Sequence, residues 1–125
     1  MNLYSIDLKI EQDIQNDLLL LSCSGINSHD THLSIIKRIR EVLSQNPTIK
    51  KIFADVTGLE GELSILEKFK VGESVSQNLL GVHIAALTIE GRINGIGENA
   101  AINRGASIFV TTNKEDAFAW LNNIA

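Results

Sequence analysis

The feature of this sequence that most constrains its fold is the last third of the chain, where signals for helix and strand alternate without a break. A glycine-bearing turn at residues 90–99 leads into a short helical segment at residues 100–105. An apolar segment at residues 106–110 is typical of a buried strand, and residues 111–121 have the spacing of an amphipathic helix. This alternation predicts an α/β architecture.

The rest of the chain continues the same alternation. Its periodicity predicts strands at residues 6–11, 18–23, 49–56, 82–89 and 107–110, and helices at residues 28–46, 62–80, 97–105 and 112–121. Thr112 and Glu115 have the spacing of a capping box at the start of the last helix. Gly72 predicts a loosened or kinked second helix, because glycine costs up to about 1 kcal/mol relative to alanine in a helix.

The order of these elements predicts the topology of the sheet. Two strands joined by a short polar segment favour an antiparallel pair, and strands separated by single helices favour parallel pairing with right-handed crossovers. We therefore expect one domain over residues 1–125, with about five strands in a mixed sheet with a parallel core, four helices, and the order β-β-α-β-α-β-α-β-α. Ligands of such sheets bind beyond the carboxyl ends of the strands. The loops at residues 55–62 and 88–98 occupy that position.

Charge and cysteine content exclude several classes of protein. The net charge of −4 argues against a nucleic acid as partner, because such binding rests on clustered Lys and Arg residues. Cys23 is the single cysteine, and its apolar neighbours predict a buried thiol. Neither a secretory signal nor an apolar run of about 20 residues is present. We therefore expect a cytoplasmic protein.

Three segments carry a resemblance to a known family. Residues 51–58 (KIFADVTG) form a strand that ends in an acidic residue and a small turn, residues 98–105 (ENAAINRG) form a short helix, and residues 115–121 (EDAFAWL) form an acidic, Ala-rich helix that ends in Trp-Leu. In these segments, and in topology over the whole chain, the sequence resembles the STAS superfamily in its SpoIIAA-like branch, also described as STAS/SEC14-like. The resemblance implies a SpoIIAA-like fold.

The resemblance also implies a candidate phosphoacceptor. In the anti-sigma-factor antagonists of this superfamily, the loop after the third strand presents a phosphorylatable Ser at a helix start, and its phosphate controls partner docking. The nearest matching hydroxyl here is Ser64, preceded by Glu62-Leu63 where that subfamily has Asp-Ser, and the adjacent Ser-Gly pair is absent. The alternative for Ser64 is an ordinary surface or capping serine.

The sequence offers two weak signals of metal binding or catalysis. His29, Asp30 and His32 place two imidazoles beside a carboxylate, but a structural metal site needs four ligands, and a helix entrance explains these residues as capping and solvent-exposed groups. The carboxylates of the two loops, among them Asp55, are not accompanied there by a nucleophile, a His or a cofactor motif. We therefore expect no metal, no cofactor and no enzymatic activity.

Two functions remain open. The first is a noncatalytic regulatory or protein-interaction module, related by resemblance to anti-sigma-factor antagonists. The second is a small apolar-ligand or lipid-binding domain with peripheral membrane contact, which the SEC14-like side of the resemblance implies; it predicts a cavity between the second and third helices, reached past Gly72 and Gly95. Homodimerisation also stays open. The candidate partner- or ligand-binding residues are Asp55, Thr57, Leu59, Leu63, Ser64, Leu66, Arg92, Ile93, Asn94 and Ile96.

Overall fold

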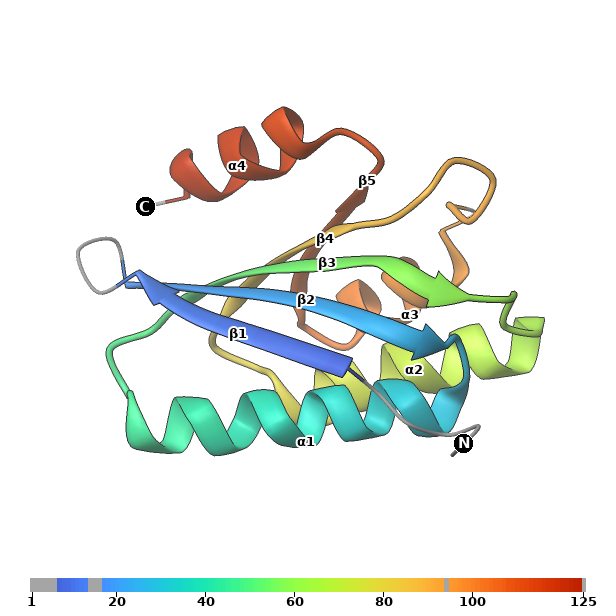
Figure 1. Ribbon diagram of the computed structural model, residues 1–125, viewed down its shortest axis with the longest axis horizontal. Coiled ribbons are helices and arrows are strands. Elements are labelled where there is room, and N and C mark those ends of the chain that lie inside the picture. The colour runs from blue at the N-terminus through green and yellow to red at the C-terminus, as the bar shows by residue number, and fades with distance from the viewer. Residues whose placement is uncertain (1–6, 14–16, 94, 125) are drawn as a thin grey trace.

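A computed structural model describes residues 7–13, 17–93 and 95–124 of the chain. Its elements follow the predicted order (Figure 1): β1 (Asp7–Asp13), β2 (Leu18–Ile26), α1 (His29–Gln45), β3 (Lys51–Glu60), α2 (Ile65–Asn78), β4 (His83–Leu87), α3 (Ile96–Asn103), β5 (Ser107–Thr111) and α4 (Lys114–Asn122). Ile6 and Asn94, which the sequence placed in the first strand and in the candidate site, lie outside the described residues.

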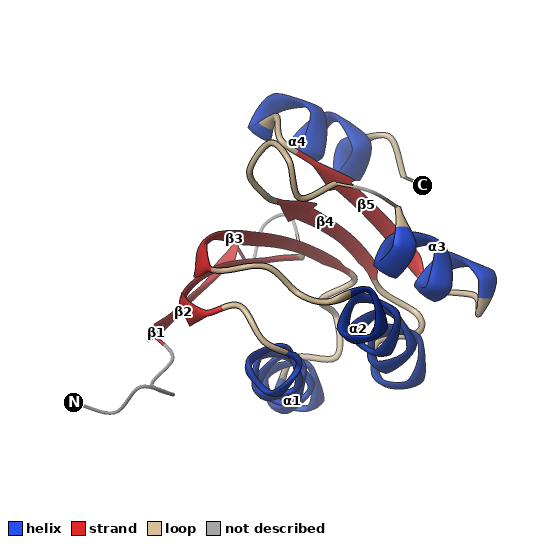
Figure 2. Cartoon of the chain, turned by 90° about the vertical axis from the view of Figure 1, so that its right-hand side faces the viewer, coloured by secondary structure: helices blue, strands red, loops and turns tan. Residues whose placement is uncertain are grey.

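The strands lie side by side in the order β1-β2-β3-β4-β5. β1 pairs antiparallel with β2, whereas β2, β3, β4 and β5 are parallel to one another. Helices α1, α2 and α3 cover one face of the sheet, and α4 lies on the opposite face (Figures 1 and 2). The predicted α/β class, with parallel strands, four helices and an antiparallel pair at the front, is confirmed.

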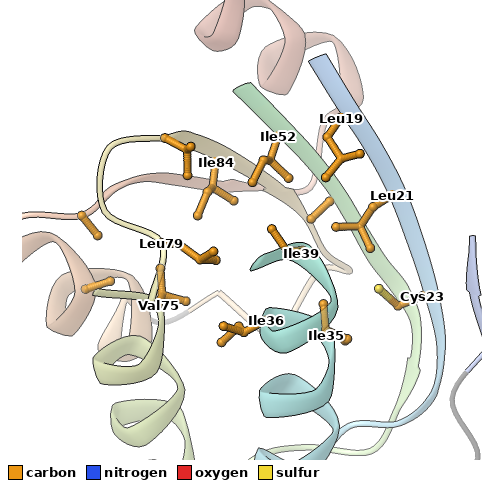
Figure 3. Packing of buried hydrophobic residues seen from close by; sticks show 14 of the residues in the cluster. Leu19, Leu21, Cys23, Ile35, Ile36, Ile39, Ile52, Val75, Leu79 and Ile84 are labelled. Atoms are coloured by element: carbon orange, nitrogen blue, oxygen red, sulfur yellow. The ribbon is translucent and has the colours of Figure 1, made fainter. Parts of the chain in front are cut away.

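Two apolar clusters lie on either side of the sheet. The larger lies between the sheet and helices α1 to α3, and it includes Leu19, Ile52 and Ile84 from the strands and Ile36 and Ile39 from α1 (Figure 3). The smaller is formed by Phe53, Ala85, Ala117 and Leu121, which join β3 and β4 to α4. Neighbouring residues of β3 belong to different clusters because successive side chains of a strand point to opposite faces.

An irregularity in β3 extends this strand beyond its predicted end at Thr57-Gly58. The pairing of β2 with β3 shifts between Ser22 and Ser24, and β3 continues to Glu60. Such a bulge adds one residue to a strand and so changes which face the following side chains reach. As a result Leu59 is buried in the same cluster as Ile52.

Glycine allows β3 to pass close to β2 at this bulge, beside the single cysteine. A Cβ atom at Gly58 would lie 2.5 Å from the carbonyl oxygen of Cys23, so only glycine fits there without a backbone shift. Cys23 is buried, as predicted. Burial, together with the nearby negative charge of Asp55, raises the pKa of its thiol to about 12.

Two predictions about helix α2 are wrong. The helix begins at Ile65 rather than at residue 62, because Ser64 is its N-cap. It also runs without interruption through Gly72 to Asn78. A Cβ atom at Gly72 would lie 2.3 Å from the carbonyl oxygen of Gly97. The glycine therefore permits close contact between α2 and α3, rather than a kink.

The capping box was predicted at the wrong helix. Helix α4 has Asn113 as its N-cap, and the Asn113 side chain accepts a hydrogen bond from the Asp116 N–H group at 3.0 Å. Asn is preferred over Thr at this position, which explains why Thr112 and Glu115 form no capping box. The box is found instead at α2, between Ser64 and Glu67.

Candidate functional site

A cavity of about 210 Å³ lies between the sheet and the three helices on its larger side. Apolar side chains from α1, β3, α2 and β4 form most of its wall, among them Ile36, Ile39, Val56, Val71, Val75 and Ile84. Gly72 and Gly95 also line it, so the cavity predicted between the second and third helices is present.

Asn27 and His32 contribute polar groups to the cavity wall. The Asn27 side chain donates from Nδ2 to the Gly61 carbonyl oxygen at 3.1 Å, and its Oδ1 lies 2.7 Å from Nε2 of His32. Because Oδ1 is an acceptor, Nε2 of His32 carries the proton in this arrangement. Burial, followed by the charge of His29, lowers the pKa of His32 to about 4, so its imidazole is neutral at physiological pH.

Two cations and two carboxylates also line the cavity: Lys68, Arg92, Glu62 and Glu98. Glu98 is already engaged, because its Oε2 accepts a hydrogen bond of 2.6 Å from the Val110 N–H group. Glu62 is exposed. Within the described parts of the chain, the ion pairs are Arg38–Glu41 and Arg104–Glu73, and neither Lys68 nor Arg92 takes part in one. The two cavity cations are therefore available to a ligand.

A second surface lies beside the cavity, on the first turns of α2. Ile65, Leu66 and Phe69, together called the α2 face, have exposed fractions of 70%, 61% and 38%. The Arg104 guanidinium lies over the Phe69 ring at 5.0 Å. Large apolar side chains gathered on an exposed surface are typical of interaction sites.

The start of α2 is held by a network around Ser64. Ser64 Oγ accepts a hydrogen bond from the Glu67 N–H group at 3.1 Å, and the Ser64 N–H group donates to Glu67 Oε1 at 3.0 Å. The His29 N–H group donates to the other oxygen of Glu67 at 3.3 Å. These backbone donors hold the pKa of the Glu67 carboxyl below its usual value. Ser64 is thus a capping serine on the molecular surface.

The structure divides the residues of the predicted site into three groups. Leu59, Leu63, Arg92 and Ile93 line the cavity, and Leu59, with an exposed fraction of 1%, belongs to the core rather than to a surface. Ser64 and Leu66 lie at the start of α2, outside the cavity wall.

The third group, Asp55, Thr57 and Ile96, does not line the cavity. Asp55 Oδ1 accepts hydrogen bonds from the Thr57 N–H and hydroxyl groups at 2.9 and 2.6 Å, so these two residues stabilise the local turn at the bulge. Ile96 is half-buried in the first turn of α3.

Reasoning from the sequence missed several cavity residues. His32 was expected to be a solvent-exposed residue at a helix entrance, but it is half-buried and lines the cavity. Its spacing of three, four and seven residues from Ile35, Ile36 and Ile39 places it on the apolar face of α1, which is a signal that could have found it. The contact between Gly72 and Gly97 left no such signal, because it joins two different helices.

The described residues hold neither a cluster of metal ligands nor a membrane-spanning helix. Within residues 7–13, 17–93 and 95–124, no three His, Cys, Asp or Glu side chains are grouped so that they could hold a metal ion. None of the helices in these ranges is long and apolar enough to cross a membrane.

Comparison with solved structures identifies the fold. An anti-sigma factor antagonist from Mycobacterium paratuberculosis superposes with a TM-score of 0.63 at 12% sequence identity, over 95% of this chain and 96% of that one. An uncharacterized DUF3478-family protein with a SpoIIAA-like fold from Shewanella loihica gives a TM-score of 0.56 at 22% identity, over 97% of each chain. No protein-family model and no curated protein matches the sequence. The chain therefore has a SpoIIAA-like fold, as the resemblance in its sequence implied.

Proposed function

We propose that this chain is a noncatalytic STAS-like regulatory module that binds a protein partner through the α2 face. The observation that carries this proposal is the exposure of Ile65, Leu66 and Phe69 at the start of one helix. Most of the binding energy of an interface comes from a few side chains that the partner covers completely. The structural likeness to an anti-sigma factor antagonist supports a regulatory role.

Ser64 is the candidate control point of this surface. A phosphoryl group on its hydroxyl would occupy the oxygen that now accepts the Glu67 N–H hydrogen bond, and it would place negative charge beside the Glu67 carboxylate. The free amides at the start of α2 favour an anion there, whereas the carboxylate opposes one. Phosphorylation would therefore replace the capping box, and it would change the helix turn that carries Ile65 and Leu66.

Photo-crosslinking tests the proposed docking surface. A benzophenone amino acid in place of Leu66 is expected to crosslink one dominant protein in cells of the source organism. The same amino acid in place of Leu33 is the matched control, because Leu33 is an exposed apolar residue of α1, outside the α2 face. Equal products from both positions would contradict the proposal. Crosslinks only to a second copy of the chain, or only to lipid, would replace it with homodimerisation or peripheral membrane contact.

The cavity favours a second candidate function, the binding of a small apolar ligand. Its volume of about 210 Å³ exceeds the roughly 150 Å³ of an engineered apolar cavity that binds benzene. Cavities of this kind, walled by aliphatic side chains with a few polar groups, are typical ligand sites. This function is compatible with the first, because the cavity wall and the α2 face use different residues of helix α2.

A further inference from the structure

Resting on the second candidate function, we propose that the cavity binds a small carboxylic acid with a single chain or a single ring. The apolar part of the acid occupies the space between the sheet and helices α1, α2 and α3, and its carboxylate is held by Arg92 with the help of Lys68. Two independent properties of the cavity indicate such a ligand: its size and the charge of its wall.

Size limits the ligand to a small molecule. An apolar cavity of roughly 150 Å³ binds benzene, with six carbon atoms, so by proportion a cavity of about 210 Å³ suits about eight carbon atoms. A phospholipid with two acyl chains carries several times as many. The volume therefore favours a medium-chain acid or a monocyclic acid over a membrane lipid.

The charged side chains of the cavity wall favour a ligand with a negatively charged head group. His32 is neutral, because burial holds its pKa at about 4, so Lys68 and Arg92 are the cationic side chains of the cavity wall. Within the described residues both are free of ion pairs. Of the two carboxylates of the wall, Glu98 is bound to the Val110 N–H group and Glu62 is exposed to solvent. The guanidinium group of Arg matches the planar geometry of a carboxylate, with which it forms two parallel hydrogen bonds.

The surroundings of Arg92 also favour an anion. Arg92 is half-buried in the turn between β4 and α3, and Gly95, the N-cap of α3, lines the same cavity. Gly95 makes no side-chain capping hydrogen bond, so the N-cap residue itself places no carboxylate or hydroxyl at the positive end of the α3 dipole. The Glu98 carboxylate lies in the first turn of α3, where it offsets part of this positive potential, and it is bound to the Val110 N–H group.

Titration calorimetry with octanoate and octanol tests this inference on the wild-type chain. The two probes share an eight-carbon chain and differ in charge, so octanoate is expected to bind at least about tenfold more tightly. Arg92→Gln is expected to remove most of this difference, because Lys68 remains, and to leave octanol binding within about twofold. Arg38→Gln is the matched control, because Arg38 is an exposed arginine of α1 outside the cavity wall, and it should keep the preference.

The alternative outcomes distinguish failure of the carboxylate inference from failure of the apolar-ligand function. Equal affinities for octanoate and octanol would overturn the carboxylate inference and leave the apolar-ligand function intact. Failure of both probes to bind at up to about 1 mM would overturn both. Binding of a lysophospholipid in preference to octanoate would overturn the limit on size. The comparison of probes on the wild-type chain decides the result even if a variant fails to fold.

Discussion

Gly72→Ala is expected to lower the free energy of unfolding by about 2 kcal/mol, although alanine is the better helix former. Alanine gains up to about 1 kcal/mol in a helix relative to glycine. Here, however, the added Cβ would lie 2.3 Å from the Gly97 carbonyl oxygen and 2.9 Å from Ala100 Cβ. Overpacking of this kind costs about 1–3 kcal/mol, and more where backbone must move. The expected result is a net loss, because α3 has to shift away from α2.

Chemical denaturation of the variant measures this effect, with Gln77→Ala as the control. Gln77 is an exposed residue of the same helix, and its replacement should change the stability by no more than about 0.5 kcal/mol. A Gly72→Ala protein as stable as the wild type would contradict the close packing of α2 against α3. Because Gly72 also lines the cavity, the same variant should alter octanoate binding.

Ile52→Ala is expected to cost about 3–4 kcal/mol of stability, whereas Ile65→Ala should be nearly neutral. Both substitutions remove the same atoms. Ile52 has an exposed fraction of 0% at the centre of the sheet, so its truncation leaves a cavity in the larger cluster. Ile65 has an exposed fraction of 70%, so its side chain contributes little to the fold.

Thermal or urea unfolding of the two isoleucine variants gives this comparison directly. A loss above about 1.5 kcal/mol for Ile65→Ala would show that Ile65 stabilises the fold, and it would remove the reason for treating Ile65 as part of a docking surface. A loss below about 1 kcal/mol for Ile52→Ala would contradict the position of this residue in a closely packed core.

The order of helices and strands could be predicted because it depends on local periodicity. The alternation of apolar positions in β2 and the spacing of three and four residues in α1 are properties of short segments. The position of the capping box could not be predicted, because Ser64–Glu67 and Thr112–Glu115 have the same spacing. No capping box forms at Thr112 because Asn113 is the N-cap of α4 instead. The free energy by which Asn is preferred to Thr as an N-cap is only a fraction of the energy of one cap.

Features that depend on contacts between distant segments escaped prediction. The bulge of β3 became visible only through its pairing with β2, and without it the burial of Leu59, a candidate binding residue, could not be predicted. For Gly72, helix propensity alone suggested a kink, because the carbonyl oxygen of Gly97 is 25 residues away in the sequence. Part of the cavity could be predicted, since Arg92 and Ile93 follow a strand at the carboxyl edge of the sheet.

Docking of a protein through the α2 face is tested most directly by measuring the affinity of the purified crosslinked partner for three forms of the chain. Leu66→Glu should weaken binding at least about 100-fold relative to wild type, because it places a charge in the covered apolar contact. Leu33→Glu, which makes the same change on α1, should bind within about twofold of wild type. Equal affinities of the wild-type and Leu66→Glu proteins would contradict docking through this face.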